Sequence, residues 1–570
     1  MSEMQIHQAK LGVPCKNSLP FLIALLFPVW MCCLPSAGVL AQEEDDTQLR
    51  QVDQINKYIR QTWNDYELKP SVEASDSEWC RRVYLDIIGR IPTVEELKEF
   101  DSDKSSDKKQ KLVETLLYDD AYTEEFVRNW TTLWTNLLIG RTGGTDNDSM
   151  INRAGMQKYL RDTFARNKPY DKMAYELIAA TGKTAPGENE FNGAVNFLID
   201  KVNEENASLA TASTSRIFLG LQVQCTQCHN HPFNDWKQQK YWEMNAFFRQ
   251  VRAFPGGMRG SNAAAQLADQ DFNGESGNID EADLFFELRN GLIKVAYPVF
   301  VDGSQIERSG YVNVVNRRKV LADKIVESPY FSKSAVNRVW AHFLGYGFTN
   351  PVDDLGPHNI PTHPELLDYL AQEFRSSSFD VRKLISWITL SQPYSLSSRR
   401  TKNNESDDPL LGEPPKFSHF YLRQMRAEEL YESLMVATQA GASRGNYEQQ
   451  EAMKSKWLGQ FTQAFGTDEG DETTTFNGTI PQVLMMFNGD LIKQATAKNG
   501  GLIDRLVKDT KLDDKDRVDY LFLAGLARKP NREESLLAKQ FYGARSGNMR
   551  EALTDLWWVV LNSNEFIFNH

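Results

Sequence analysis

Cysteine is scarce in this chain, and several common enzyme signatures are missing from it. Six of its 570 residues are cysteine, too few for a disulfide-rich secreted scaffold. Neither a phosphate-binding loop nor a dinucleotide fingerprint occurs. There is also no repeat of fixed period and no continuous strand alternation. The sequence therefore points to no nucleotide-dependent enzyme class, and it names no substrate.

Positive charge is in deficit as well. The formal net charge is −13 at pH 7, and a field of that sign repels polyanions, so nucleic acid is not an expected partner. Hydrophobic residues make up 41% and charged residues 25%, which is an ordinary globular composition. A chain of this length is too long for one hydrophobic core, which predicts two or three domains. The oligomeric state does not follow from these quantities.

Residues 1–41 have the parts of a secretory signal peptide. Lys10 and Lys16 give a basic start, residues 19–34 form a short apolar run, and small residues precede Ala41. This order predicts cleavage after Ala41 and export to the periplasm or the extracellular space. The apolar run is too short for a comfortable transmembrane helix, so we expect no stable membrane span after cleavage. An uncleaved segment that anchors the protein is the alternative.

Cleavage would also change the charge and the cysteine count. Residues 1–41 carry Lys10, Lys16 and Glu3, a net charge of +1, so the mature chain would have −14 instead of −13. Three cysteines would remain, of which two lie close together: Cys80, Cys225 and Cys228. A single close pair in so long a chain suggests a local function for that pair.

Helical periodicity dominates the mature chain. We expect a mainly α protein with two helical domains, residues 42–255 and 311–570. The domains would be joined by an irregular Gly/Asn/Asp-rich connection, residues 256–310, with little strand. The one strand-like run in this connection is residues 295–301. Thr93 to Glu96 has the spacing of a capping box that opens a helix.

The closest grouping of metal-ligating residues is Cys225-Thr-Gln-Cys228-His229-Asn-His231-Pro-Phe233. Cys-x-x-Cys-His is the attachment pattern of c-type haem. Cys225 and Cys228 would form thioethers to the porphyrin, and His229 would ligate the iron. Export agrees with this interpretation, because bacteria attach c-type haem outside the cytoplasm.

The opposite axial position is open at this stage. Met244 is the nearest methionine downstream, but it is reached only if the following helix folds back over the ring. Three distant histidines are equal candidates, and so is a position without a protein ligand: His342, His358 and His363.

Two other sites share this cysteine spacing. Zinc or iron could be held by Cys225, Cys228 and either His229 or His231, with a fourth ligand from elsewhere. The second imidazole, at His231, is not required for haem attachment and favours this alternative. The third interpretation is a disulfide between the two cysteines.

A second cluster of polar residues lies in a Pro/Gly-containing segment, with Asp353, Asp354, His358 and His363. Two carboxylates and two imidazoles could bind a divalent metal or act as acid and base. The structural alternative, which we favour, is that the aspartates make turn hydrogen bonds and His363 lies at a helix start.

Motifs along nearly the whole mature chain resemble a planctomycete secreted family. For its N-terminal half they are residues 81–89, 169–171, 225–233, 247–248 and 297–303; for its C-terminal half they are residues 337–340, 345–347, 351–354, 363–368 and 562–566. The family pairs a cytochrome-like domain of unknown function with a second domain of unknown function. The resemblance implies an exported protein with a c-type haem, and it implies no reaction.

The motif departs from the family pattern at two positions. Family members commonly read Cys-Ala-x-Cys-His-Asp-His-Pro-Phe, whereas Thr226 and Asn230 stand in this sequence. The carboxylate lost beside His229 would have been a metal ligand or an imidazole partner.

Three function hypotheses follow. The first is an exported redox or electron-transfer protein with a haem c and a redox partner protein. The second is a non-haem zinc or iron metalloprotein or hydrolase that uses the same Cys/His cluster. The third is a secreted structural or binding protein in which the cluster only stabilises the fold.

Overall fold

The computed structural model describes residues 37–146, 148–202, 207–232, 236–256, 264–439, 449–454, 457–458 and 501–570. Most of the predicted signal peptide, residues 1–36, lies outside these residues, and so does Phe233 of the Cys/His motif. The chain divides into two compact units, Met1–Thr47 and Gln48–His570. No helix within the described ranges is long and apolar enough to cross a membrane.

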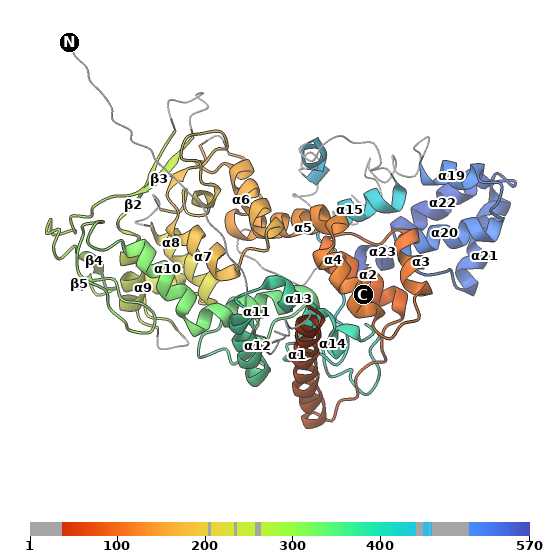
Figure 1. Ribbon diagram of the computed structural model, residues 1–570, viewed down its shortest axis with the longest axis horizontal. Helices are drawn as coiled ribbons and strands as arrows, with labels where there is room; N and C mark the ends of the chain where they lie inside the picture. The colour runs from red at the N-terminus through yellow and green to blue at the C-terminus, as the bar shows by residue number, and fades with distance from the viewer. Residues whose placement is uncertain are drawn as a thin grey trace, which may run out of the picture. The chain divides into compact units, whose positions relative to one another are not determined.

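The prediction of a mainly α protein is confirmed (Figure 1). The first helices are α1 (Ala37–Asp65), α2 (Asp76–Ile88), α3 (Val94–Ser102), α4 (Lys108–Tyr118), α5 (Asp120–Ile139), α6 (Arg153–Ala165), α7 (Tyr170–Ala179), α8 (Ser208–Thr214), α9 (Gln238–Asn245), α10 (Arg317–Glu327) and α11 (Pro329–Leu344). The later ones are α12 (Pro364–Ser376), α13 (Val381–Thr389), α14 (Gln392–Ser395), α15 (Ala427–Thr438), α19 (Leu502–Lys508), α20 (Asp514–Leu526), α21 (Arg532–Ala544), α22 (Met549–Leu561) and α23 (Asn564–Ile567).

Strands are few and short in the described chain. They are β1 (Gly182–Lys183), β2 (Val251–Phe254), β3 (Gln266–Asp269), β4 (Leu284–Glu287), β5 (Ile293–Ala296), β6 (Arg423–Gln424) and β7 (Phe568–Asn569). They form three antiparallel sheets, ordered β1-β3-β2, β4-β5 and β6-β7. The run predicted at residues 295–301 is strand only as far as Ala296. Pro298 follows, and it has no N–H to donate to a ladder.

The main hydrophobic core draws on both of the expected domains. Trp79, Phe197 and Trp340 are fully buried in the same core cluster. Residues Gln48–His570 form one compact unit, so the boundaries predicted around 256–310 stay a prediction.

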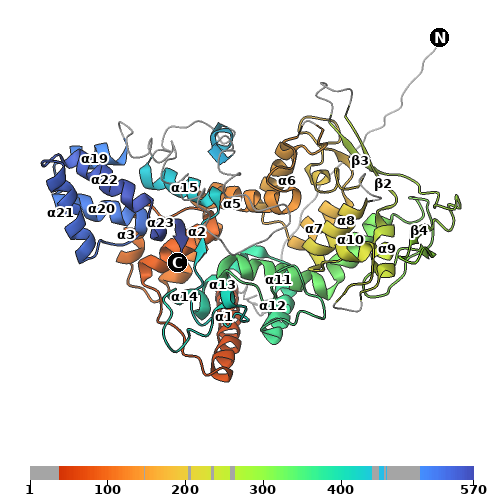
Figure 2. The ribbon, with the colours of Figure 1, turned by 180° about the vertical axis from the view of Figure 1, so that it is seen from behind.

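A second core cluster brings together two distant parts of the chain. Leu85 of α2 and Val94 of α3 are buried with Leu506, Phe522 and Trp557 of the C-terminal helices. Figures 1 and 2 both show α2 beside α23. Helices assigned by sequence to the first domain therefore pack within the core of the C-terminal helices.

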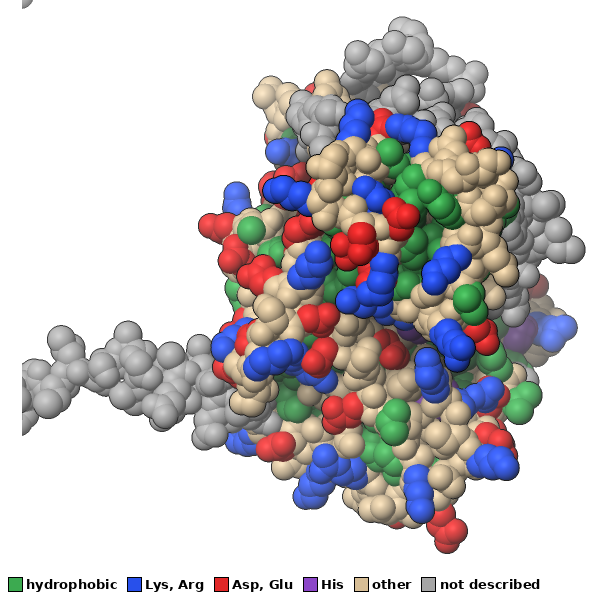
Figure 3. Space-filling model, turned by 90° about the vertical axis from the view of Figure 1, so that its right-hand side faces the viewer, with side chains coloured by type: hydrophobic (Ala, Val, Ile, Leu, Met, Phe, Trp, Pro, Cys, Tyr) green, Lys and Arg blue, Asp and Glu red, His purple; other side chains and the backbone are tan. Residues whose placement is uncertain are grey.

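The C-terminal helices α19–α22 carry a mixed surface. On the face drawn in Figure 3, acidic and basic side chains are interspersed, with apolar side chains between them. α21 has no buried residue, and three of its large apolar side chains are exposed: Leu536, Leu537 and Tyr542. α21 therefore packs against its neighbours without burying any residue fully.

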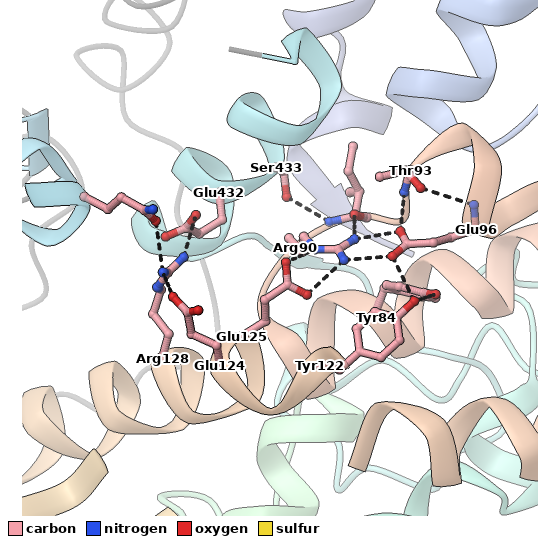
Figure 4. A network of polar contacts seen from close by, with 12 residues as sticks. Tyr84, Arg90, Thr93, Glu96, Tyr122, Glu124, Glu125, Arg128, Glu432 and Ser433 are labelled. Carbon is pink, nitrogen blue, oxygen red and sulfur yellow. Dashed lines mark hydrogen bonds and ion pairs between the residues drawn. The ribbon is translucent and has the colours of Figure 1, made fainter. Parts of the chain in front are cut away.

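A buried ionic network joins α2, α3 and α5 (Figure 4). Arg90 donates to both carboxylate oxygens of Glu96, at 2.8 and 2.9 Å, and to both oxygens of Glu125, at 2.8 and 2.9 Å. Tyr122 donates to Glu96 at 3.0 Å. Thr93 and Glu96 form the predicted capping box at the start of α3, which is confirmed. Glu96 thus links a helix cap to a neighbouring helix.

Replacing Glu96 with glutamine is expected to destabilise the protein at pH 7 by about 1–3 kcal/mol, because Arg90 loses half of its charge partners in a mostly buried site. Burial alone would raise the pKa of Glu96, but hydrogen bonds from Arg90 and Thr93 hold it below its ordinary value of 4.5. A depressed folded-state pKa stabilises the fold above the unfolded-state pKa, and this contribution is lost as the pH falls. The deficit should therefore shrink below about pH 4, as urea unfolding would measure.

The matched control is Glu99→Gln, an exposed carboxylate on the same helix. Its effect should stay within about 0.5 kcal/mol. A Glu96→Gln deficit of constant size from pH 7 to pH 3 would contradict the electrostatic account.

Candidate functional site

Cys225 lies on a short 3-10 turn, η4 (Gln224–Gln227), and Cys228 is the residue that caps this turn at its C-terminal end. Both thiols are exposed, and no disulfide joins them. Thr226 between them is fully buried and donates its hydroxyl to the carbonyl of Val223 at 2.5 Å. The turn is therefore anchored by its inward residue and presents Cys225 and Cys228 outward.

His229 follows the turn and is partly exposed. Its Nδ1 lies 2.7 Å from the backbone carbonyl of Asn230. Because a carbonyl only accepts hydrogen bonds, Nδ1 carries the proton and Nε2 keeps its lone pair. This is the tautomer that a metal-ligating histidine needs. A backbone carbonyl thus orients the ring of His229.

Contacts from α9 hold the turn in place. Gln238 and Trp242 both donate to the carbonyl of Gln227, at 3.0 and 3.2 Å. The Asn230 side chain accepts from the backbone N–H of Gln238 at 3.0 Å, and His231 donates its N–H to the carbonyl of Trp236 at 2.8 Å. Figures 1 and 2 show α9 close to α8 and α10. A helix therefore braces the segment on its C-terminal side.

A π-helical turn, η3 (Ser215–Leu219), leads into the motif. π-helical turns are rare in proteins, and those that occur are often found at functional sites. The carbonyl of Ile217 accepts from Arg338 at 2.7 Å and from Ser334 at 3.2 Å, both on α11. Gly220 ends the turn at φ +63°, a conformation that favours glycine. α11 therefore supports the motif from its N-terminal side.

The second predicted cluster lies against the same segment. Asp353 is buried, accepts from Gln222 at 2.6 Å and pairs with Arg216 at 3.3 Å. The backbone N–H of Leu355 donates to the carbonyl of Gly220 at 2.7 Å. Asp353 thus has a structural role, because both of its carboxylate oxygens are engaged.

Asp354 and His358 reach the Cys/His motif itself. His358 Nε2 lies 2.9 Å from an oxygen of Asp354. The rings of His358 and His231 are in contact, with centroids 5.1 Å apart and planes 44° apart. Burial, followed by His358, lowers the pKa of His231. Although Cys225 is exposed as a residue, partial desolvation of its thiol, with a contribution from Asp354, raises the pKa of Cys225. The Cys/His motif and the segment from Asp354 to His358, which are far apart in the sequence, therefore lie at the same site.

His363 is not part of this place. It is buried at the start of α12, with Nδ1 2.8 Å from the hydroxyl of Thr362, and its ring packs on Phe348 and Phe417. Burial lowers its pKa to about 4. The structure thus places His363 in aromatic packing at a helix start, as the structural alternative expected.

The residues named as candidates for the opposite axial position lie in different parts of the structure. Met244 is 1% exposed within the main core. His342 is half-buried, with Nε2 3.1 Å from the carbonyl of Asp86 and its ring against Trp130. Of the named residues, His358 contacts the motif.

The side chains of the Cys/His motif can be compared with what a zinc or iron site needs and with what a c-type haem needs. Among the described residues, no three His, Cys, Asp or Glu side chains are grouped so that they could hold a metal ion. A covalently attached haem requires fewer protein groups than a metal-ion site. It requires two accessible thiols and one imidazole nitrogen. Cys225, Cys228 and His229 fit that requirement.

Sequence patterns did not predict several supports of the site. The π-turn and the contacts of Arg338 with Ile217 have no local signature, because they depend on residues more than a hundred positions apart. A buried arginine can be recognised only when its carbonyl partners are known.

Comparison with known proteins gives two matches. Residues 54–253 match a family model described as "PSCyt2: Protein of unknown function (DUF1549)", and residues 317–474 match one described as "PSD1: Protein of unknown function (DUF1553)". No curated protein and no solved structure matches the chain. The Cys/His turn lies in the first matched region, and the segment from Asp353 to His358 lies in the second. The chain thus carries, in this order, regions of two families of unknown function.

Proposed function

We propose that this protein is an exported redox or electron-transfer protein with a c-type haem attached at Cys225 and Cys228 and ligated by His229. The observation that carries the proposal is the pair of exposed, unlinked thiols on one turn, followed by an imidazole whose Nδ1 is bound to a backbone carbonyl. When bound, the haem would supply one-electron transfer.

The chain's own residues would attach and orient the group. Thr226 anchors the turn inward, so that both thiols face outward. The carbonyl of Asn230 holds the proton on Nδ1 of His229 and leaves Nε2 for the iron. A redox partner protein would exchange electrons with the group. The sequence pattern of residues 1–41 supports export.

A non-haem metal centre is the second candidate. It is supported by the contact of His231 with His358, which brings a second imidazole to a histidine of the Cys/His motif. This centre would bind zinc or iron with Cys225 and Cys228.

The test is the visible spectrum and metal content of the exported protein, produced with c-type haem maturation available. Haem that remains attached after denaturation, with the absorption of a reduced c-type haem, is the expected result. Colourless protein with one zinc per chain would overturn the haem proposal in favour of the second candidate. Colourless protein without metal would leave only a stabilising role for the cluster.

A further inference from the structure

The segment that follows α11 packs against the residues that precede the Cys/His turn. The segment from Asp353 to His358 belongs to the second matched region, yet it bonds to the segment that leads into the motif. Asp353 accepts from Gln222 at 2.6 Å, and Leu355 donates to Gly220 at 2.7 Å. These contacts hold the segment beside residues 220–222, shortly before the Cys/His motif.

Asp354 and His358 form a partly buried acid–imidazole pair there. Their side chains are 14% and 21% exposed, and 2.9 Å separates His358 Nε2 from the Asp354 carboxylate. The His358 ring contacts the ring of His231 at a tilt of 44°, and His231 lies two residues after the expected iron ligand. A charge that is partly shielded from water acts more strongly on its neighbours than an exposed one. Asp354 is therefore positioned to influence the charge state of a group held at the turn.

We propose that Asp354 and His358 are positioning residues that set the reduction potential of the centre at Cys225, Cys228 and His229. The inference rests on the proposed function. Groups close to a haem or its ligands tune its potential through charge and hydrogen bonding. The second matched region would thus be a working part of the redox site.

The two residues act with opposite signs. A carboxylate favours the oxidised state, which carries one more positive charge, so Asp354 lowers the potential. A hydrogen bond with the His358 ring weakens the field of that carboxylate. Asp354→Asn should therefore raise the midpoint potential, whereas His358→Ala should lower it. If the substitutions only loosened the segment, the midpoint potentials of both variants would shift in the same direction.

The experiment is a redox titration of the full-length protein loaded with haem, followed by its visible spectrum. We expect Asp354→Asn to change the ratio of reduced to oxidised protein about tenfold at a fixed potential, equivalent to about 59 mV for one electron. His358→Gln retains a side-chain N–H for Asp354 and should restore a potential near that of the wild type. Glu365→Gln, an exposed carboxylate on the first turn of α12, is the matched control and should have no effect.

The outcomes separate the inference from the proposed function. A colourless wild-type protein would overturn the proposed function and, with it, the inference. A wild-type protein with haem whose potential is unchanged by Asp354→Asn would overturn the inference alone. Shifts of the same sign in Asp354→Asn and His358→Ala would also overturn it. If His358→Ala does not fold, Asp354→Asn and His358→Gln still decide the question.

Discussion

On the proposed function, a variant with both Cys225 and Cys228 replaced by serine is expected to carry no covalently attached haem. A hydroxyl group does not form the thioether bond, so the effect is all or none. Each single variant should retain haem through one remaining thioether. Denaturing gel electrophoresis with haem staining, together with the spectrum of the intact protein, would measure the loss.

The fold should survive this change. Both thiols are exposed and unlinked, so serine at either position removes no buried contact, and surface substitutions of this kind shift stability by about 0.5 kcal/mol or less. Cys80→Ser is the control for haem content, because Cys80 is buried in the main core and does not belong to the Cys/His motif. Full haem retention in the double variant would contradict attachment at this motif.

Replacing Asp86 with alanine is expected to cost about 3–5 kcal/mol of folding free energy, because it leaves a buried charge unpaired. Asp86 is fully buried and pairs with Arg423 of β6. It also accepts from Tyr394 at 2.7 Å and from Asn569 of β7 at 2.7 Å. Burial lowers the pKa of Arg423 to about 10, so its guanidinium is still charged at neutral pH. Urea unfolding at pH 7 would measure the loss.

A double variant distinguishes the buried charge from lost packing. Asp86→Leu combined with Arg423→Met removes both charges and should recover part of the stability, since apolar replacements of buried ion pairs are often tolerated. Asp368→Ala is the surface control. It breaks an exposed pair with Lys333 and should cost no more than about 1 kcal/mol. A loss below 1 kcal/mol for Asp86→Ala would contradict the prediction.

Two buried arginines also join α2 to distant parts of the chain. Arg81 of α2 donates to the carbonyls of Gly525 and Phe566, at 2.7 and 2.9 Å. Arg82 donates to the carbonyl of Tyr394. Both arginines are buried. Their sequence pattern, charged residues spaced between apolar ones, is equally typical of the solvent-exposed face of a helix. Carbonyl groups supplied by distant segments satisfy these guanidinium groups and help to make their burial favourable.

The sequence by itself determined the local features of this protein. The helical character, the cap at Thr93 and the helix start at His363 followed from periodicity and side-chain chemistry within a few residues, and the structure confirms them. The Cys225–His229 motif is equally local, since one turn presents both thiols. These features depend on neighbours in the chain, which is why a sequence pattern reports them.

Tertiary structure decided which residues share a site. Asp354 and His358 lie beside His231, more than a hundred residues away in sequence, whereas His363, only five residues after His358, is buried elsewhere. The supports of the turn, such as the bond from Arg338 to Ile217, likewise join distant segments. Such contacts arise only when whole helices pack, because the free energy of packing depends on partners that no local pattern specifies.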